Sequence, residues 1–231
     1  MTTDAHCHLV RDDARHFLCE PLAEGTAAGP ADLIFRGIHP WLVDAAPADA
    51  LETLRARLRE EPRTGVGEIG LDRLRERNIS SAMRALFEAQ LALAAEFGRP
   101  VVLHGAKCWG EVVKTIESGT WRTGAGADRI PGFLFHGFSR SGGLLPAIVA
   151  LNGYVSVGPA ILNDHAVNYR ELAKAIPSDR LLVESDATAE TADGLAPVGD
   201  LVAKLAALRG CSADALSAVL EANADRFADM L

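Results

Sequence analysis

Short runs of β-branched and apolar residues alternate with amphipathic helical runs along the whole chain, and this alternation constrains the fold more than any other feature. It is typical of βαβ units around a parallel sheet. Eight runs suit strands, at residues 2–8, 16–19, 33–38, 64–69, 100–104, 132–136, 154–157 and 181–184. Eight such units close into a (β/α)8 barrel, usually of about 250 residues and at least about 200. We therefore predict an α/β fold, a (β/α)8 TIM barrel, as one domain over residues 1–231.

The helices between these strands have readable boundaries. Pro47 suits a first helical turn, and leucines then recur at helical spacing at 51, 54 and 58. The longest helix is predicted over residues 80–97 and ends at Gly98, because glycine readily adopts the left-handed conformation found at helix ends. Further helices are predicted at residues 108–118, 141–151, 167–176, 197–209 and 212–230.

The predicted barrel is trimmed between its first and third strands. Only residues 9–32 are available there for two βα units, and Gly25, Gly29 and Pro30 make much of this segment poor helix. We expect the first helix to be missing or reduced to a turn.

The first strand carries polar side chains that are unusual for packing. If residues 2–8 form a strand, Asp4, His6 and His8 project to one face, and Ala5 and Cys7 project to the other. Neutral imidazoles are the commonest protein metal ligands, and a nearby carboxylate can hold the tautomer of a ligand. Taken alone, the stretch is equally consistent with an exposed pair of histidines.

Further reactive residues fall at the carboxyl ends of other predicted strands, where a barrel of this type holds its active site. His104 and His136 end the fifth and sixth strands. Glu68 lies near the end of the fourth strand, and Asp186 follows the eighth. The predicted metal ligands are therefore His6, His8, Glu68, His104, His136 and Asp186.

Four imidazoles and two carboxylates are more than one four-coordinate site would use, so two divalent ions fit better. The ions of two-metal hydrolytic centres lie about 3.5–4 Å apart. We assign one ion to His6, His8 and Asp186, the other to His104 and His136, and Glu68 to both as a bridge. The mixed nitrogen and oxygen donors suit Zn²⁺, Mn²⁺, Mg²⁺ or Fe²⁺.

Glu68 and Asp186 are also the predicted catalytic residues. Two bound ions would lower the pKa of a shared water and neutralise the oxygens of a phosphate. Asp186 is placed to orient that water and to accept its proton, or it acts as a ligand alone.

The bulk composition excludes several classes of protein. A net charge of -8 argues against broad electrostatic binding to nucleic acid or to an anionic membrane, although it is compatible with a local basic patch. No run reaches the roughly 18 apolar residues of a membrane helix, and no export signal is present. The four cysteines lack CxxC spacing. We expect reduced thiols in a cytoplasmic protein, a monomer without an obligate protein partner.

Several motifs follow one another in a distinctive order: residues 4–9 (DAHCHL), 37–40 (GIHP), 67–72 (GEIGLD), 100–104 (PVVLH), 136–139 (HGFS) and 182–186 (LVESD), with Asn223, Arg226 and Phe227 near the end. Together they resemble the TatD-type metal-dependent deoxyribonucleases and hydrolases, which belong to the amidohydrolase-like barrels. The resemblance implies a (β/α)8 fold, a two-metal site on the ligands above, and hydrolysis of phosphodiester bonds in DNA, often from an end.

The departures from the family's motifs fall on the side of the substrate. After His104 the family usually has Ser or Cys and then Arg, whereas this chain has Gly105, Ala106 and Lys107. Hydrolase chemistry is therefore implied more directly than the DNA substrate.

Five residues of the predicted mouth loops are candidates for substrate contacts. Lys107 and Arg140 would bind phosphates through charge-assisted hydrogen bonds. A base would stack on Trp41 or Trp109, although each ring also suits core or rim packing. The six predicted ligands do not include His39, so we assign this residue to a contact with a substrate phosphate or to a hydrogen bond with a ligand.

Three functions are compatible with these features. The first is a divalent-metal-dependent phosphodiesterase that acts on DNA or oligonucleotides. The second is a two-metal hydrolase of a small amide, ester or lactone, against which the Glu68 bridge argues because such relatives often use a modified lysine. The third is a binding protein without activity, which the intact ligand set disfavours.

Overall fold

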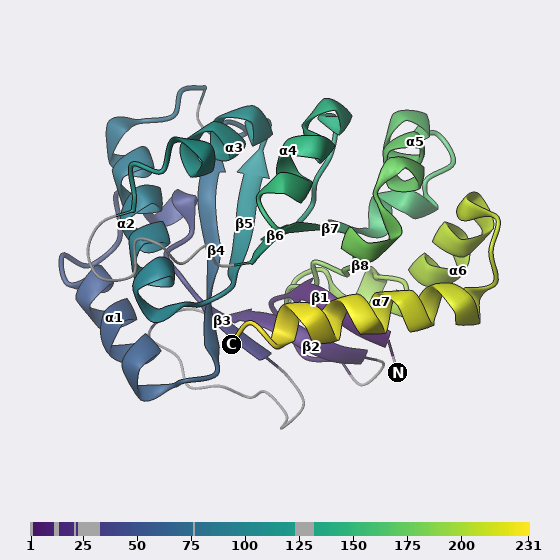
Figure 1. The fold of residues 1–231 in the computed structure, drawn as a ribbon, viewed down its shortest axis with the longest axis horizontal. Helices are drawn as coiled ribbons and strands as arrows, with labels where there is room; N and C mark the ends of the chain where they lie inside the picture. The colour runs from purple at the N-terminus through teal and green to yellow at the C-terminus, as the bar shows by residue number, and fades with distance from the viewer. Residues whose placement is uncertain (1, 12–13, 21, 23–32, 76, 123–131) are drawn as a thin grey trace.

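Eight parallel strands follow one another around a single sheet, each paired with the next (Figure 1). The structure is a computed structural model and describes residues 2–11, 14–20, 22, 33–75, 77–122 and 132–231. The strands are β1 Thr2–Cys7, β2 Ala14–Glu20, β3 Leu33–Arg36, β4 Thr64–Asp72, β5 Val101–Ala106, β6 Phe133–Phe135, β7 Gly153–Val157 and β8 Leu181–Val183. The predicted (β/α)8 TIM-barrel fold is confirmed.

Helices lie around the outside of the strands and begin and end close to the predicted residues (Figure 1). They are α1 Ala50–Glu60, α2 Ser81–Phe97, α3 Trp109–Ser118, α4 Leu145–Ala150, α5 Val167–Ala175, α6 Val198–Arg209 and α7 Ala213–Ala228. Helix α2 shows why such ends are readable: the Ser80 hydroxyl accepts a hydrogen bond from Met83 N at its start, and Gly98 takes a φ of 63° at its end. No helix of the described ranges is both long enough and apolar enough to cross a bilayer.

The connection between β1 and β2 is shorter than a βα unit needs, because only six residues, 8–13, separate the two strands. Residues 8–11 form no helix, in agreement with the prediction, and residues 12–13 and 23–32 lie outside the described residues. Other residues cover these strands. Cys7 and Leu18 pack in a small cluster with Ala187 and Leu195, which come from the segment after β8.

The barrel closes between β1 and the residues that follow β8. Asp186 N donates to His6 O at 3.0 Å, and His8 N donates to Ala187 O at 2.8 Å. Ser185 adds two further bonds, since its amide and its hydroxyl donate to the two oxygens of Asp4 at 2.8 and 2.5 Å. Burial raises the pKa of Asp4 to about 6 despite these hydrogen bonds.

The prediction that Asp4 shares a face with His6 and His8 is wrong. The register of β1 against β2 shifts between Asp4 and Cys7, so two residues of β1 stand where strict alternation expects one. Ala5 therefore joins the apolar interior with Phe17, while Asp4 turns to the seam with Ser185. A bulge of this kind leaves no mark in the sequence pattern.

Helix α7 closes the amino-terminal end of the barrel. Its Ala224 and Phe227 pack with interior side chains from β1, β2, β3, β5, β6, β7 and β8. Phe227 lies 5.8 Å from Phe17 and 5.6 Å from Tyr154 between ring centroids. In the middle of the helix, a carboxylate oxygen of Glu221 accepts a hydrogen bond from Thr3 N at 2.5 Å. Figure 1 shows α7 running across β1 and β2, so the open end of the barrel is the one at the carboxyl ends of the strands.

Candidate metal centre

Strand β4 carries Glu68, and at Gly70 its backbone approaches that of β5 too closely for a side chain. Gly70 has a φ of 150°, and a Cβ atom at this position would lie 2.0 Å from His104 O. Only glycine permits that approach. Glu68 and His104 come from these two neighbouring strands, and His104 Nδ1 lies 2.6 Å from a Glu68 oxygen.

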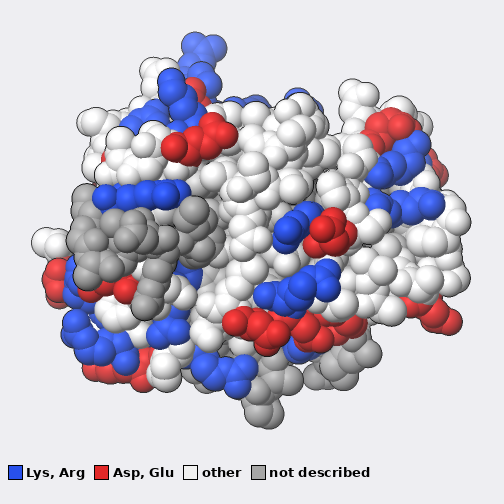
Figure 2. All heavy atoms as spheres, in the orientation of Figure 1, with Lys and Arg blue, Asp and Glu red and all other residues white. Residues whose placement is uncertain are grey.

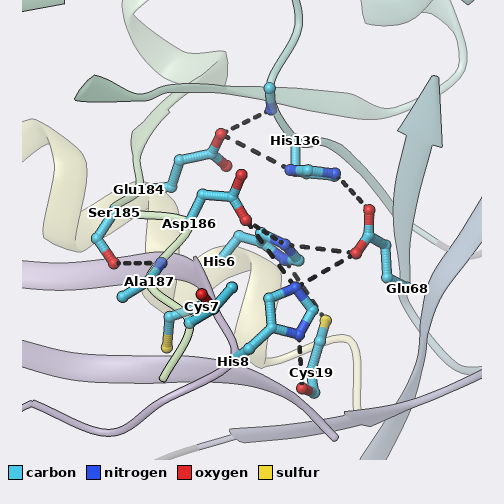
Figure 3. Close-up of polar contacts among 12 residues, drawn as sticks. His6, Cys7, His8, Cys19, Glu68, His136, Glu184, Ser185, Asp186 and Ala187 are labelled. Atoms are coloured by element: carbon cyan, nitrogen blue, oxygen red, sulfur yellow. Dashed lines mark hydrogen bonds and ion pairs between the residues drawn. The ribbon is translucent and has the colours of Figure 1, made fainter. Parts of the chain in front are cut away.

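One oxygen of Glu68 faces the first group of predicted ligands (Figure 3). Glu68 Oε2 lies 3.7 Å from His6 Nε2 and 3.5 Å from His8 Nε2, and Asp186 Oδ1 lies 3.5 and 3.9 Å from the same two nitrogens. Four donors held about 2.1 Å from one tetrahedral ion would be separated by about 3.4 Å. The spacing of this group therefore fits a cation.

A buried nitrogen without a partner points the same way. His6 is fully buried, and its Nε2 has no hydrogen-bond partner among the described residues. An unsatisfied buried polar atom is costly. A metal ion in this position would satisfy it.

The other oxygen of Glu68 faces the second group. Glu68 Oε1 lies 2.6 Å from His104 Nδ1, 2.5 Å from His136 Nε2 and 3.7 Å from His39 Nε2. The structure thus brings all six predicted ligands together, and the single carboxylate of Glu68 lies between two sets of imidazoles. Three overlapping groups of these side chains are close enough to hold a cation: His6 with His8 and Glu68, His6 with His136 and Asp186, and His39 with Glu68 and His104.

Glu68 and His136 shift each other's pKa values. Burial alone would raise the pKa of Glu68, but His136 and the hydrogen bonds of His104 and His136 hold that pKa well below its usual range. Burial likewise opposes protonation of His136, yet Glu68 and Glu184 raise the pKa of His136 well above its usual value. A cation bound to these groups would replace such a proton, because metal ligands bind in their deprotonated form.

Asp186 differs from the buried members of the cluster because its side chain is 51% exposed. Burial works to raise its pKa, but His6 lowers the pKa below the usual value. Asp186 also has a φ of 52°, which is rare for a residue other than glycine. The carboxylate is therefore ionised at neutral pH and held at the open side of the cluster.

Two residues without an assigned role in the sequence hold the histidines in place. Cys19 on β2 contacts both histidines of the first strand: its Sγ lies 3.5 Å from His6 Nδ1 and its carbonyl oxygen 3.1 Å from His8 Nδ1. Asp72 lies 2.8 Å from His104 Nε2. Asp72 follows Glu68 by four residues on the same strand face, which is a signal that alternation along β4 provides. Nothing in the sequence marks Cys19.

His39 lies within reach of the second group, but its hydrogen bonding argues for a different role. His39 Nδ1 accepts a hydrogen bond from Trp41 N at 3.1 Å. In a neutral imidazole the other nitrogen then carries the hydrogen. His39 Nε2 is therefore a donor that points toward Glu68 Oε1.

The remaining substrate candidates divide into exposed and buried side chains. Lys107 and Arg140 are exposed at the mouth, with φ values of 56° and 59°. Trp41 is 49% exposed, and its Nε1 donates to Asp72 Oδ2 at 2.9 Å. Trp109 is only 5% exposed and packs against Phe135 and Phe138. Of the two alternatives for Trp109, the structure favours core packing over base stacking, because core side chains cover most of its ring.

The sequence matches the family described as TatD related DNase over residues 26–229. A 3'-5' ssDNA/RNA exonuclease TatD from Pantoea vagans (strain C9-1) is 30% identical over 201 residues, which cover 81% of this chain and 74% of that protein. The protein of the same name from Edwardsiella piscicida is 32% identical over 152 residues, which cover 65% of this chain and 56% of that protein. The chain thus spans little more than half of the latter relative's length.

Solved structures have the same barrel. YJJV, a TatD homolog from Escherichia coli k12, superposes with a TM-score of 0.78 at 23% identity and covers 98% of this chain and 97% of that chain. A hydrolase TatD family protein from Entamoeba histolytica superposes with a TM-score of 0.73 at 13% identity over the same shares of the two chains. The likeness to these structures shows the fold, and the sequence match over most of its length shows that this chain belongs to the TatD related DNase family.

Proposed function

We propose that the protein is a two-metal phosphodiesterase that cleaves DNA. The observation that carries the proposal is the position of Glu68, one carboxylate oxygen of which faces His6 and His8 while the other faces His104 and His136. Bridging carboxylates hold pairs of ions in hydrolytic centres of this kind. The chemistry of the donors supports Zn²⁺, Mn²⁺, Mg²⁺ or Fe²⁺.

In this proposal one ion would be held by His6, His8 and Asp186. The other ion would be held by His104 and His136, and Glu68 would bind both ions. When bound, two divalent ions supply Lewis-acid stabilisation of a phosphate and a more acidic water. Asp186 orients the attacking water and accepts its proton, because its carboxylate is ionised and lies at the open side of the cluster. Glu184 accepts a hydrogen bond from Gly137 N at 2.6 Å and lies 3.8 Å from His136 Nδ1, so its negative charge faces that imidazole.

The residues around the centre would position the phosphate and the terminal nucleotide. His39 donates a hydrogen bond from Nε2 to a phosphate oxygen, and Lys107 and Arg140 supply positive charge. The exposed ring of Trp41 stacks against a base, since its hydrogen bond to Asp72 fixes the plane of the indole. The names of the relatives, 3'-5' ssDNA/RNA exonucleases, support a single strand as the substrate and attack from its 3' end.

The test measures metal and cleavage on the same preparation. Elemental analysis of the purified protein is expected to find two divalent ions per chain, and the protein is expected to shorten single-stranded DNA in a reaction that a chelator stops. Absence of bound metal after incubation with Mn²⁺ or Zn²⁺ would contradict the site. Bound metal without cleavage of DNA would favour the amide, ester or lactone hydrolase, which assays with such substrates would then reveal.

A further inference from the structure

Two grooves lie beside the metal centre, one on each side of the loop that follows His136, and only the first is lined by a proposed ligand, Asp186. The first, of about 1030 Å³, runs past Glu184 and Asp186 toward α5. The second, of about 840 Å³, lies between the loops that follow β4, β5 and β6, and is lined in part by α3. Gly137, Ser139 and Arg140 border both grooves.

The second groove collects positive charge in a chain whose net charge is -8. We call it the basic groove, because its charged lining residues in the described ranges are Arg73, Lys107, Lys114 and Arg140 with one carboxylate, Glu111. The first groove contains Arg140 together with Glu171, Glu184 and Asp186. A chain of phosphates would therefore be attracted more strongly to the basic groove than to the first.

The single carboxylate of the basic groove does not cancel its cations. Glu111 lies 4.0 Å from Arg73 and 3.6 Å from Arg84, so two arginines already neutralise it. Lys107, Lys114 and Arg140 have no ion pair within the described part of the chain. Lys107 follows His104 by three residues and Arg140 follows His136 by four, so these free charges begin beside the metal ligands.

An apolar side chain lies along the same groove. Leu74 is 60% exposed and lines the basic groove next to Arg73. The large hydrophobic side chains exposed on the described surface are Leu9, Trp41, Leu42, Leu74 and Val167, and each follows the carboxyl end of a strand. Such a rim suits a ligand that presents apolar faces as well as charge, which the bases and phosphates of an unpaired strand do.

We propose that the basic groove holds the backbone of an unpaired polynucleotide strand on its way from the metal centre, with the bases toward Leu74. This inference rests on the proposed function and adds the path of the strand. Lys107 and Arg140 contact the phosphates nearest the cleaved bond, and Lys114 contacts a phosphate farther along the strand. Duplex DNA is excluded from this path because its bases are paired and stacked.

The test measures the salt dependence of binding by the metal-loaded protein. The probe is a fluorescein-labelled dT12 with phosphorothioate linkages, which keep the charge and slow cleavage, and binding is followed by anisotropy. Each lost phosphate contact makes the slope of log Kd against log [KCl] shallower by about 0.7 for a single strand. Lys114→Ala is expected to show this change and, if the curves meet at 1 M KCl, a Kd raised about eightfold at 50 mM KCl.

Arg63→Ala is the matched control, because Arg63 is exposed at the opposite end of the barrel, just before β4. Its slope is expected to equal that of the unmodified protein. The proposed path would be overturned if the two variants had equal slopes. It would also be overturned if Lys114→Ala raised the Kd for dT2 as much as the Kd for dT12.

A second variant tests the bases. Leu74→Ser is expected to weaken binding of dT12 more than binding of an abasic strand of equal length, and equal losses would refute the contact with Leu74. Different results would contradict the proposed strand path and the proposed function. Cleavage of DNA with an unchanged slope in Lys114→Ala would refute the groove alone, whereas groove-dependent binding without cleavage would refute the proposed function alone.

Discussion

Glu68 is the residue on which both donor sets depend, because each of its oxygens faces a different set. Glu68→Gln replaces one of these oxygens with an NH2 group, which cannot act as a ligand. The variant is expected to bind less metal, and its kcat/KM is expected to fall at least about 100-fold. Elemental analysis after dialysis, combined with the DNA cleavage assay, measures both. Glu60→Gln, an exposed change in α1, is the control, and full metal content in Glu68→Gln would refute the bridge.

The reaction of the four cysteines with a thiol reagent tests which of them are buried. Cys7, Cys19 and Cys108 are buried, whereas Cys211 is exposed. Burial raises the pKa of the Cys108 thiol to about 12, so this group stays protonated at pH 8 and gains thiolate only as the pH approaches 12. Because the thiolate is the nucleophile, a thiol reagent at pH 8 is expected to modify one cysteine rapidly and the others only after unfolding. Mass spectrometry with a Cys211→Ser control identifies the site, and rapid labelling of Cys108 would contradict the buried position.

The clustering of the proposed ligands could be predicted because the rule for finding them depends only on where strands end. His104, His136 and Asp186 each stand at such an end, and a shift of one residue in the strand boundaries does not move them from the mouth. Asp4 could not be predicted in the same way. Its direction depends on the bulge in β1, which arises from pairing with β2 and not from the pattern of β1 itself.

At the scale of elements, helix α2 holds the loop that carries His39. Gln90 on α2 accepts a hydrogen bond from Ile38 N at 2.7 Å and donates one to Ile38 O at 3.1 Å. Gln90→Leu leaves two buried backbone groups unsatisfied, and the expected loss of unfolding free energy is about 2–4 kcal/mol. Urea denaturation measures it. Ala85→Ser, an exposed change on the same helix, is expected to stay within about 0.5 kcal/mol, and a similar small loss in Gln90→Leu would contradict the hydrogen bonds.

The elements themselves were largely predictable because their ends carry local signals. Ser80 and Gly98 mark α2 by side-chain capping and by a left-handed backbone, both of which are properties of single residues. Strand β4 runs to Asp72, three residues beyond the predicted end, because its pairing with β5 continues past Ile69. Such pairing depends on the partner strand and not on the local pattern. Trp109 illustrates the same limit, since only the packed barrel shows that Phe135 and Phe138 cover its ring.

At the scale of the whole molecule, positive charge and exposed apolar side chains are not spread evenly over the surface. The face in Figure 2, across which α7 runs, shows Lys and Arg side chains interleaved with Asp and Glu side chains, without a continuous basic field. The basic groove lies instead at the mouth. The overall negative charge therefore does not conflict with a polyanionic substrate, because the attraction is local.

Closure of the amino-terminal end by α7 gives a prediction about the stability of the entire barrel. Phe227 is fully buried against aromatic side chains of β2, β3 and β7. Phe227→Ala is expected to lower the unfolding free energy by about 3–5 kcal/mol, because it removes a large side chain and leaves a cavity. Val167→Ala, at a residue that is 61% exposed, is the control for loss of apolar volume. Equal urea midpoints for the two variants would show that α7 does not close the barrel.

The seam between β1 and β8 has a consequence for synthesis. Asp4 and Ser185, whose hydrogen bonds close it, are 181 residues apart in the chain. Translation at about 5–20 residues per second separates their appearance by roughly 10 to 35 s. During this interval His6 and His8 have emerged from the ribosome, but Asp186 and the strand that completes the ring have not. Shorter nascent chains lack Asp186 and the strand before it, so the cluster of proposed ligands is complete only in a chain that has been made through its eighth strand.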